Sequence, residues 1–128
     1  MTFSLKASTG ARIIFFSSSL TKLSSVLPNT LVYVATKGAI EQLSRVLAKD
    51  FGVRGITVNT VSPGPTDTDL FREGKPENHI KYIASLAPLN RLGLPDEIAP
   101  IISFLASPAA GWINGQNILV NGVSTVVC

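Results

Sequence analysis

Two residues four positions apart, Tyr33 and Lys37, carry side chains that can do acid–base chemistry together. At this spacing in a helix, two side chains share one face and lean the same way along the axis. A nearby ammonium group stabilises the phenolate form of a phenol. A tyrosine so placed can donate a proton to a carbonyl oxygen or take one from an alcohol. The alternative interpretation is a surface lysine beside a partly buried aromatic side chain.

Residues 12–16, Arg-Ile-Ile-Phe-Phe, form an apolar run rich in β-branched and aromatic side chains. Such a run predicts a strand of a parallel sheet that is buried on both faces. Three serines, residues 17–19, follow at the carboxyl end of this strand, where parallel sheets place their ligands. We expect the hydroxyl of Ser18 to hold the same substrate oxygen on which Tyr33 acts.

The helix that must position Tyr33 and Lys37 is predicted over residues 30–52. One set of side chains recurs there at helical spacing, and a set of charged side chains falls on another side of the helix. Gly52 and Gly55 are signals for the end of the helix. The recurring positions are Thr36, Ile40, Leu43 and Leu47, and the charged ones are Glu41, Arg45 and Lys49.

The rest of the chain alternates strand and helix signals. Strands are predicted over residues 56–61 and 117–121, and helices after residues 67–69, over residues 77–86 and from Pro95 onwards. Asp67 and Asp69 are interpreted as caps of the short helix, and Trp112 is expected to pack rather than to stack on a ligand. Alternation of this kind predicts an α/β fold with a three-stranded parallel sheet.

The composition is that of one globular domain, with 128 residues, 45% of them hydrophobic, and a net charge of +3. The basic residues form no run, so we expect neither nucleic acid nor a membrane as a partner. A single cysteine, Cys128, favours a reducing, cytoplasmic location, and with one histidine, His79, no metal site is expected. We find no signal-peptide pattern and no apolar run long enough to span a bilayer.

Seven motifs follow one another in order from about residue 3 to residue 122, and together they resemble the short-chain dehydrogenase/reductase family. The resemblance is closest to its members that are like 3-ketoacyl-carrier-protein reductases. The motifs are Arg-Ile-Ile-Phe-Phe-Ser-Ser-Ser (12–19), Tyr-Val-Ala-Thr-Lys-Gly-Ala (33–39), Gly-Ile-Thr-Val-Asn-Thr-Val-Ser-Pro-Gly (55–64), Arg-Leu-Gly-Leu-Pro-Asp-Glu-Ile-Ala (91–99), Phe-Leu-Ala-Ser (104–107), Ile-Asn-Gly-Gln (113–116) and Val-Asn-Gly (120–122).

The resemblance implies roles for three residues in hydride transfer between a nicotinamide cofactor and a carbonyl or alcohol substrate. Ser18 matches the serine that binds the reacting oxygen, and its neighbours Ser17 and Ser19 leave that match open by one residue. Tyr33 matches the general acid/base. Lys37 matches the lysine that holds the nicotinamide ribose and assists the tyrosine.

Four further positions match residues that contact the cofactor, NAD(P)(H), for which NADPH is the expected form. Pro63 and Gly64 match the turn beside the nicotinamide, Thr66 the backbone that meets the carboxamide, and Thr68 a hydroxyl that reaches the cofactor. Turn chemistry explains residues 63–65 equally well. Helix capping is an equal alternative for Thr68.

The sequence departs from the family pattern in the part that normally binds the phosphates of the nucleotide. No Gly-x-Gly and no Asn-Ala-Gly occurs, so the glycine-rich phosphate loop is absent, and Val123 stands where a second glycine is usual. The resemblance therefore implies that residues 1–128 are one partial domain, the C-terminal half of a Rossmann-like doubly wound parallel sheet. We expect exposed strand edges, exposed apolar patches and marginal stability.

Two functions of different class follow from these observations. The first is an oxidoreductase that acts on a small carbonyl or alcohol substrate and assembles as a homo-oligomer. The second is a truncated remnant without catalytic activity, which serves as an oligomerisation or interaction module.

Overall fold

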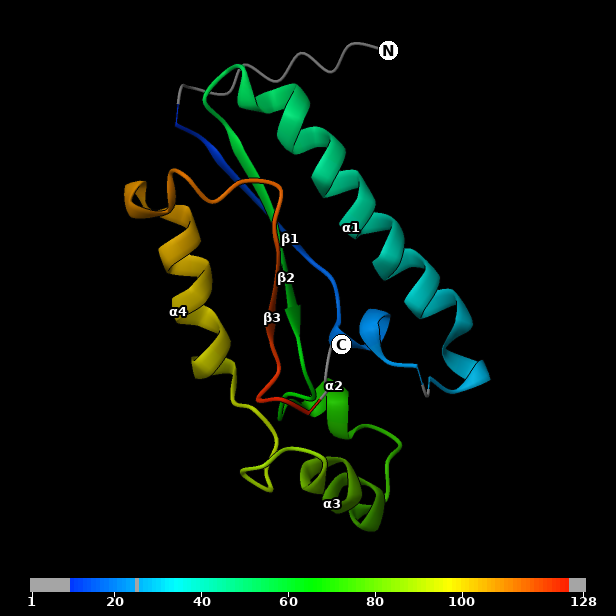
Figure 1. The fold of residues 1–128 in the computed structure, drawn as a ribbon. Coiled ribbons are helices and arrows are strands. Elements are labelled where there is room, and N and C mark those ends of the chain that lie inside the picture. The colour runs from blue at the N-terminus through cyan, green and yellow to red at the C-terminus, as the bar shows by residue number, and fades with distance from the viewer. Residues whose placement is uncertain (1–9, 25, 125–128) are drawn as a thin grey trace.

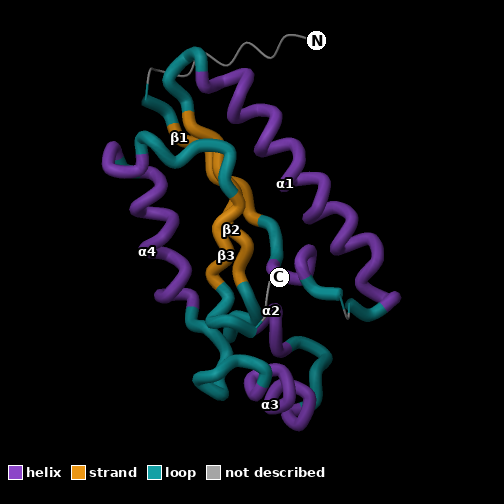
Figure 2. Tube along the Cα trace, viewed as in Figure 1, coloured by secondary structure: helices purple, strands orange, loops and turns teal. Residues whose placement is uncertain are grey.

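The computed structural model describes residues 10–24 and 26–124, so that Cys128 lies outside the described residues. Its middle layer is a parallel sheet of β1 (Arg12–Phe16), β2 (Thr57–Pro63) and β3 (Asn117–Val120) (Figure 2). Within the described residues the strand order is β1-β2-β3, with Ile14 opposite Asn59 and Val61 opposite Ile118. The α/β fold with three parallel strands that alternate with helices is confirmed.

Two helices cover opposite faces of this sheet (Figure 1). The helix α1 (Leu31–Gly52) packs through Ala48 and Phe51 on one face, and α4 (Pro95–Ala106) packs through Leu105 on the other. Because side chains alternate along a strand, β1 sends Ile13 and Phe15 toward α1, and Ile14 toward α4. Each face thus has its own core, and the sheet is wound on both sides.

Shorter elements gather near the carboxyl ends of the strands (Figure 1). They are the 3₁₀ helices η1 (Ser19–Lys22) and η2 (Pro28–Thr30) and the helices α2 (Asp69–Arg72) and α3 (Glu77–Ser85); a third 3₁₀ helix, η3 (Pro108–Ala110), follows α4. The predicted helix start at Pro95 is confirmed, and the carboxylate of Glu97 accepts a hydrogen bond of 2.8 Å from the Leu94 N–H just before it.

Three burial predictions are wrong. The strand expected to be buried on both faces, β1, is half-buried, because it has a strand neighbour on one side alone within the described residues; β2 is the buried strand. Glu41, expected on the charged side of its helix, is 8% exposed, and Trp112, expected to pack, is 99% exposed. The periodicity of a helix does not reveal which neighbouring segment covers each of its sides.

Two asparagine side chains join the loop before β3 to the rest of the fold. Asn114 Oδ1 accepts a hydrogen bond of 2.8 Å from Val58 N, and its Nδ2 donates one of 3.1 Å to the carbonyl oxygen of Ala48. Asn59 bonds in the same way to Ile113 O and Gln116 N. These bonds hold β3 beside β2 and dock the C-terminal part of α1 on the sheet.

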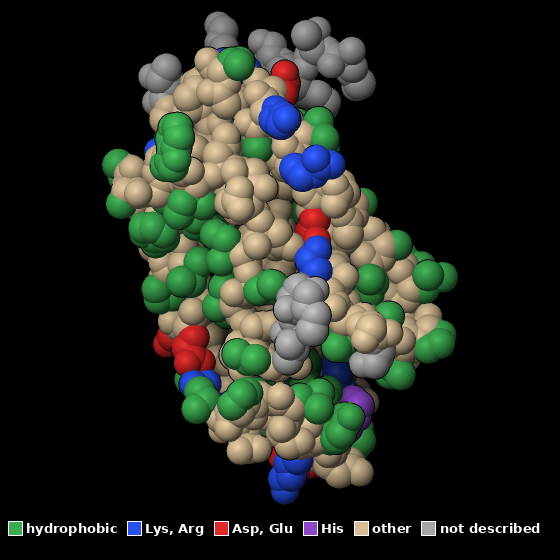
Figure 3. Space-filling model, viewed as in Figure 1, with side chains coloured by type: hydrophobic (Ala, Val, Ile, Leu, Met, Phe, Trp, Pro, Cys, Tyr) green, Lys and Arg blue, Asp and Glu red, His purple; other side chains and the backbone are tan. Residues whose placement is uncertain are grey.

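Apolar side chains remain on the surface over α4 and over the start of α1 (Figure 3). On α1 they include Leu31, Val32 and Val46, and beside or on α4 they include Leu94 and Phe104. The expected apolar exposure is therefore present on both helical layers. None of the helices in the described part of the chain is long and apolar enough to cross a membrane.

Candidate active site

Tyr33 and Lys37 lie in the first turns of α1, at the end of that helix near the carboxyl ends of the strands. The Lys37 ammonium nitrogen stands 5.7 Å from the centroid of the Tyr33 ring. It also donates a hydrogen bond of 3.1 Å to the carbonyl oxygen of Phe16, the last residue of β1. The Tyr33 side chain is 47% exposed. The predicted pair thus shares one helix face, and its lysine is tied to the strand end.

The first two of the three serines after β1 differ in what their side chains do. Ser17 Oγ lies 2.8 Å from Glu41 Oε1 and 3.1 Å from the carbonyl oxygen of Lys37, so its proton is engaged by α1. Ser18 Oγ accepts a hydrogen bond of 3.3 Å from Leu20 N, which caps η1 and leaves the Ser18 proton for another acceptor. The sequence left the choice between neighbouring serines open, and these bonds favour Ser18 over Ser17 as the donor to a substrate.

A buried carboxylate, Glu41, lies one turn beyond Lys37 on α1. Its Oε2 is 2.7 Å from the ammonium of Lys22, and Ser17 and Thr21 both donate to its Oε1. Burial by itself raises the pKa of Glu41, but the hydrogen bonds from Lys22, Thr21 and Ser17 outweigh that effect and lower the pKa below its ordinary value. Glu41 is therefore a paired anion between α1 and the loop that carries Ser18.

The end of β2 and the turn after it carry Pro63, Gly64, Thr66 and Thr68, and Gly64 packs closely against Asn121. A Cβ on Gly64 would stand 2.7 Å from Asn121 Cα, so close packing against the end of β3 already requires a glycine. Thr66 forms an isolated parallel bridge with Gly93, and the bonds of that bridge use the backbone atoms of Pro65 and Asp67. The N–H and C=O of Thr66 therefore point to the other side of the segment.

The side chain of Thr68 caps a helix, as one of its two interpretations predicted. Its Oγ1 accepts a hydrogen bond of 3.1 Å from Phe71 N at the start of α2. Asp67, by contrast, is not the cap, because its carboxylate forms an ion pair with Arg72 that lowers the pKa of Asp67. Asp69 lies in the first turn of α2. The Thr68 hydroxyl proton stays available, since capping uses the oxygen as an acceptor.

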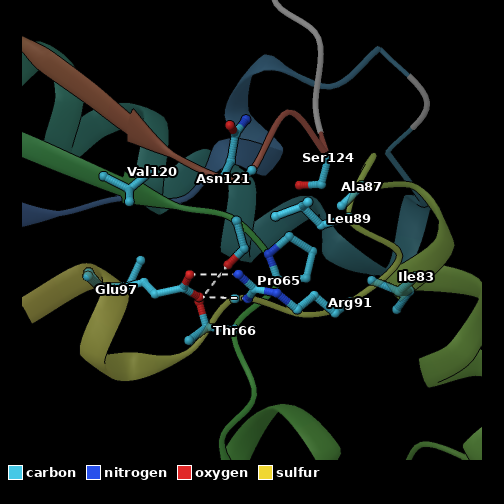
Figure 4. Close-up of a pocket in the computed structure, with 14 residues that line it drawn as sticks. Pro65, Thr66, Ile83, Ala87, Leu89, Arg91, Glu97, Val120, Asn121 and Ser124 are labelled. Carbon is cyan, nitrogen blue, oxygen red and sulfur yellow. Dashed lines mark hydrogen bonds and ion pairs between the residues drawn. The ribbon is translucent and has the colours of Figure 1, made fainter.

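A pocket of about 170 Å³ opens on the α4 side of the strand ends (Figure 4). Gly64 and Thr66 line it together with apolar side chains that include Ile83 and Val120. An Arg91–Glu97 ion pair of 2.7 Å closes one side, and the bond from Arg91, followed by that from Leu94 N, lowers the pKa of Glu97 to about 2. The lining of the pocket is therefore mainly apolar, and the charged groups beside it, Arg91 and Glu97, bond to each other.

The predicted site residues fall into two groups that flank the ends of the strands. Ser18, Tyr33 and Lys37 lie on the α1 side and do not line this pocket, whereas Gly64 and Thr66 do. Sequence reasoning missed Glu41, although its spacing of four from Lys37 and eight from Tyr33 places it on their helix face. It also missed Lys22, and it considered Ser17 only as a possible substrate-binding serine. The bonds of these two residues to Glu41 are what distinguish them from other polar loop residues.

Known proteins share this arrangement of strands and motifs. The family model described as enoyl-(acyl carrier protein) reductase matches residues 3–123. A mutant of a Serratia marcescens short-chain dehydrogenase/reductase superposes with a TM-score of 0.82 and 32% identity, over 93% of this chain and 47% of the other. The chain belongs to the short-chain dehydrogenase/reductase family.

Two further proteins similar to this chain have a cofactor in their names or titles. An NADPH-dependent aldehyde reductase-like protein of the Arabidopsis thaliana chloroplast is 41% identical over 118 residues, which are 92% of this chain and 43% of that protein. A blue fluorescent protein from a metagenomic library, solved with NADPH, has a TM-score of 0.85 and 33% identity, over 94% of this chain and 48% of that one. The chain spans about half the length of the curated relatives it matches.

The donors at the site fit the nicotinamide half of a dinucleotide. Lys37 is a half-buried residue whose ammonium group has three protons, of which one is given to Phe16 O. Thr66 presents its backbone away from the Gly93 bridge, and Thr68 retains a hydroxyl proton. These groups match the hydroxyls of a ribose and the amide of a carboxamide.

Proposed function

We propose that this chain forms the catalytic part of an NAD(P)(H)-dependent oxidoreductase that interconverts a carbonyl and an alcohol. The observation that carries the proposal is the contact of Lys37 with both the Tyr33 ring and the end of β1, next to Ser18. The nicotinamide, when bound, supplies or accepts the hydride at the carbonyl carbon. NADPH is the form favoured by the names of the relatives.

In this mechanism, side chains of the protein bind the substrate oxygen and transfer a proton to it. Ser18 donates a hydrogen bond to the carbonyl oxygen, and Tyr33 Oη transfers its proton to that oxygen as the hydride reaches the carbon. The products are an alcohol and a tyrosinate, which solvent reprotonates; oxidation runs through the same steps in reverse. The ammonium of Lys37 stabilises the tyrosinate and holds the ribose.

The turn of residues 63–68 completes the proposed cofactor contacts. Pro63 and Gly64 shape the wall beside the nicotinamide, because the approach of Asn121 leaves no room for a side chain at Gly64. The Thr66 backbone meets the carboxamide, and the Thr68 hydroxyl donates to the cofactor while it caps α2.

Titration of the protein with NADPH and NADH, followed by cofactor fluorescence, tests the binding part of this proposal. We expect saturable binding of NADPH. In Lys37→Ala the affinity should fall about tenfold, which corresponds to a loss of about 1.4 kcal/mol of binding free energy. Lys49→Ala removes an exposed lysine from the same helix and should leave binding unchanged. Absence of binding at millimolar cofactor would contradict the proposal for this chain.

A second candidate function, an interaction module or homo-oligomer, is favoured by the apolar surface of α1. Leu31 and Val32 are 73% and 74% exposed, and Val46 is 59% exposed. Exposed apolar side chains on one helix favour burial against a partner. Sedimentation over a range of concentrations tests it: a dimer or larger assembly that dissociates in Val46→Asp supports it, and a monomer at all concentrations contradicts it. The cytoplasmic location stays a prediction from cysteine usage.

A further inference from the structure

A carboxylate that the proposed reaction does not use, Glu41, connects α1 to the loop after β1. Its side chain is 6% exposed, and Ser17, Thr21 and Lys22 of that loop all bond to it. Ser17 Oγ lies 2.8 Å from Oε1, Thr21 Oγ1 also donates to Oε1, and Lys22 Nζ is 2.7 Å from Oε2.

These three bonds surround Ser18 in the chain. The Thr21 hydroxyl lies within bonding distance of both Glu41 Oε1 and the carbonyl oxygen of Ser18, at 2.9 Å from the latter. Thr21 N also donates to that carbonyl, at 3.2 Å. On the other side of Ser18, the Ser17 hydroxyl reaches Glu41 and the carbonyl of Lys37. The backbone of Ser18 is thus held to Glu41 from both sides.

Burial makes this connection stiff. A carboxylate taken out of water is strongly unfavourable unless hydrogen-bond donors and a cation replace the lost hydration. Glu41 regains them from residues 17–22 together, so movement of the loop away from α1 would leave a buried charge with fewer partners. Glu41 and Tyr33 lie eight residues apart on one helix, and α1 therefore sets the place of both the loop and the phenol.

We propose that Glu41 is a positioning residue, which holds the Ser18 hydroxyl in register with Tyr33 so that both act on one substrate oxygen. This inference rests on the proposed oxidoreductase function for its catalytic consequence. Its structural part, the tie between Glu41 and the loop, does not depend on that function. Small displacements of a positioning group reduce turnover strongly, because the reacting geometry is narrow.

Glu41→Gln tests the proposal, since it keeps the side-chain size and removes the charge. Asp50→Asn is the matched control, because it neutralises an exposed carboxylate on the same helix. Two quantities are measured in each variant: amide hydrogen exchange at Leu20 and Thr21, and kcat and KM for NADPH-dependent carbonyl reduction. Exchange at Leu47 and Ala48 reports on the rest of α1.

In Glu41→Gln we expect exchange at Leu20 and Thr21 to rise about tenfold, with exchange at Leu47 and Ala48 unchanged. The kcat should fall on the order of 10- to 100-fold while KM for NADPH changes less than about threefold. Asp50→Asn should match the wild type in both measurements. If Glu41→Gln does not fold, Thr21→Val removes the hydroxyl bridge and carries the same expectation for the exchange at Leu20 and for kcat.

Three outcomes would overturn the proposal. Unchanged exchange at Leu20 would show that Glu41 does not hold the loop, and an equal rise along α1 would show general destabilisation. A local rise with unchanged kcat would remove the catalytic consequence. Failure of the proposed function would give a different result, because neither the wild type nor Tyr33→Phe would then reduce a carbonyl. The exchange data would still show whether Glu41 holds the loop.

Discussion

Gly64 and Asn121 are in backbone contact, such that a Cβ on Gly64 would stand 2.7 Å from Asn121 Cα and 3.0 Å from Asn121 O. The contact joins the turn after β2 to the end of β3, where Gly64 N donates a hydrogen bond of 2.9 Å to Val120 O. A glycine is therefore required here by the packing of the protein itself. The same packing leaves no room for a side chain at Gly64, in the turn where the cofactor is proposed to lie.

Gly64→Ala should lower the free energy of unfolding by about 1–3 kcal/mol, because the added methyl group meets backbone that cannot move aside. The control is Gly38→Ala, which lies inside α1 with no atom within 4 Å of the added Cβ. That change should raise stability by roughly 0.5–1 kcal/mol, since alanine is the better helix former. Urea denaturation measures both values, and equal effects in the two variants would contradict the packing argument.

Val123 has a φ of 60°, in the left-handed region that a β-branched residue rarely adopts. It stands where the resemblance to the family predicts a glycine. Val123→Gly should therefore stabilise the protein by about 0.5 kcal/mol, because the relief of strain exceeds the added flexibility of the unfolded chain. Val46→Gly, a change at an equally exposed valine within α1, should instead destabilise by about 1 kcal/mol. Thermal unfolding compares the pair, and destabilisation by both changes would argue against strain at Val123.

Tyr33→Phe should reduce the rate of carbonyl reduction by about 10²- to 10⁴-fold, because it removes the proposed proton donor and leaves the ring. NADPH binding should change little. Tyr82→Phe removes the hydroxyl from an exposed tyrosine of α3 and is the control. Loss of NADPH absorbance in the presence of a carbonyl substrate gives the rates. Full activity in Tyr33→Phe would exclude Tyr33 as the acid.

Lys22→Met should destabilise the protein by about 1–3 kcal/mol near neutral pH, because it leaves the buried Glu41 carboxylate without its cation. The folded protein holds the pKa of Glu41 below the unfolded value of 4.5. The ion pair therefore contributes fully above about pH 4.5, and its contribution is lost as the pH falls through the folded pKa.

Urea midpoints of the wild type and Lys22→Met, compared at neutral and at acid pH, measure this dependence. The difference between the two proteins should be largest above pH 4.5 and shrink below it. Lys81→Met, which changes an exposed lysine on α3, is the control for loss of a positive charge. A difference that grows on acidification would contradict the assigned sign of the Glu41 shift.

Several features of this protein follow from the sequence alone. Local patterns are enough to predict β1 over residues 12–16, where β-branched and aromatic residues end in polar serines, and α1, whose predicted range of 30–52 differs from Leu31–Gly52 by one residue. The spacing of Tyr33 and Lys37 also determines that they share a face, because helix geometry has a fixed period. The family is likewise predictable, since its motifs and their order can be read directly from the sequence.

Only the tertiary structure decides which sides of these elements are covered. Glu41 is charged, like Arg45 and Lys49 of the same helix. It is nevertheless buried, because residues 17–22 fold over it and supply its hydrogen-bond donors. Trp112 is apolar and yet exposed. Gly64 must be a glycine because Asn121, which follows β3 far along the chain, approaches it closely. Burial and close contact depend on segments distant in sequence, so a local pattern carries no record of them.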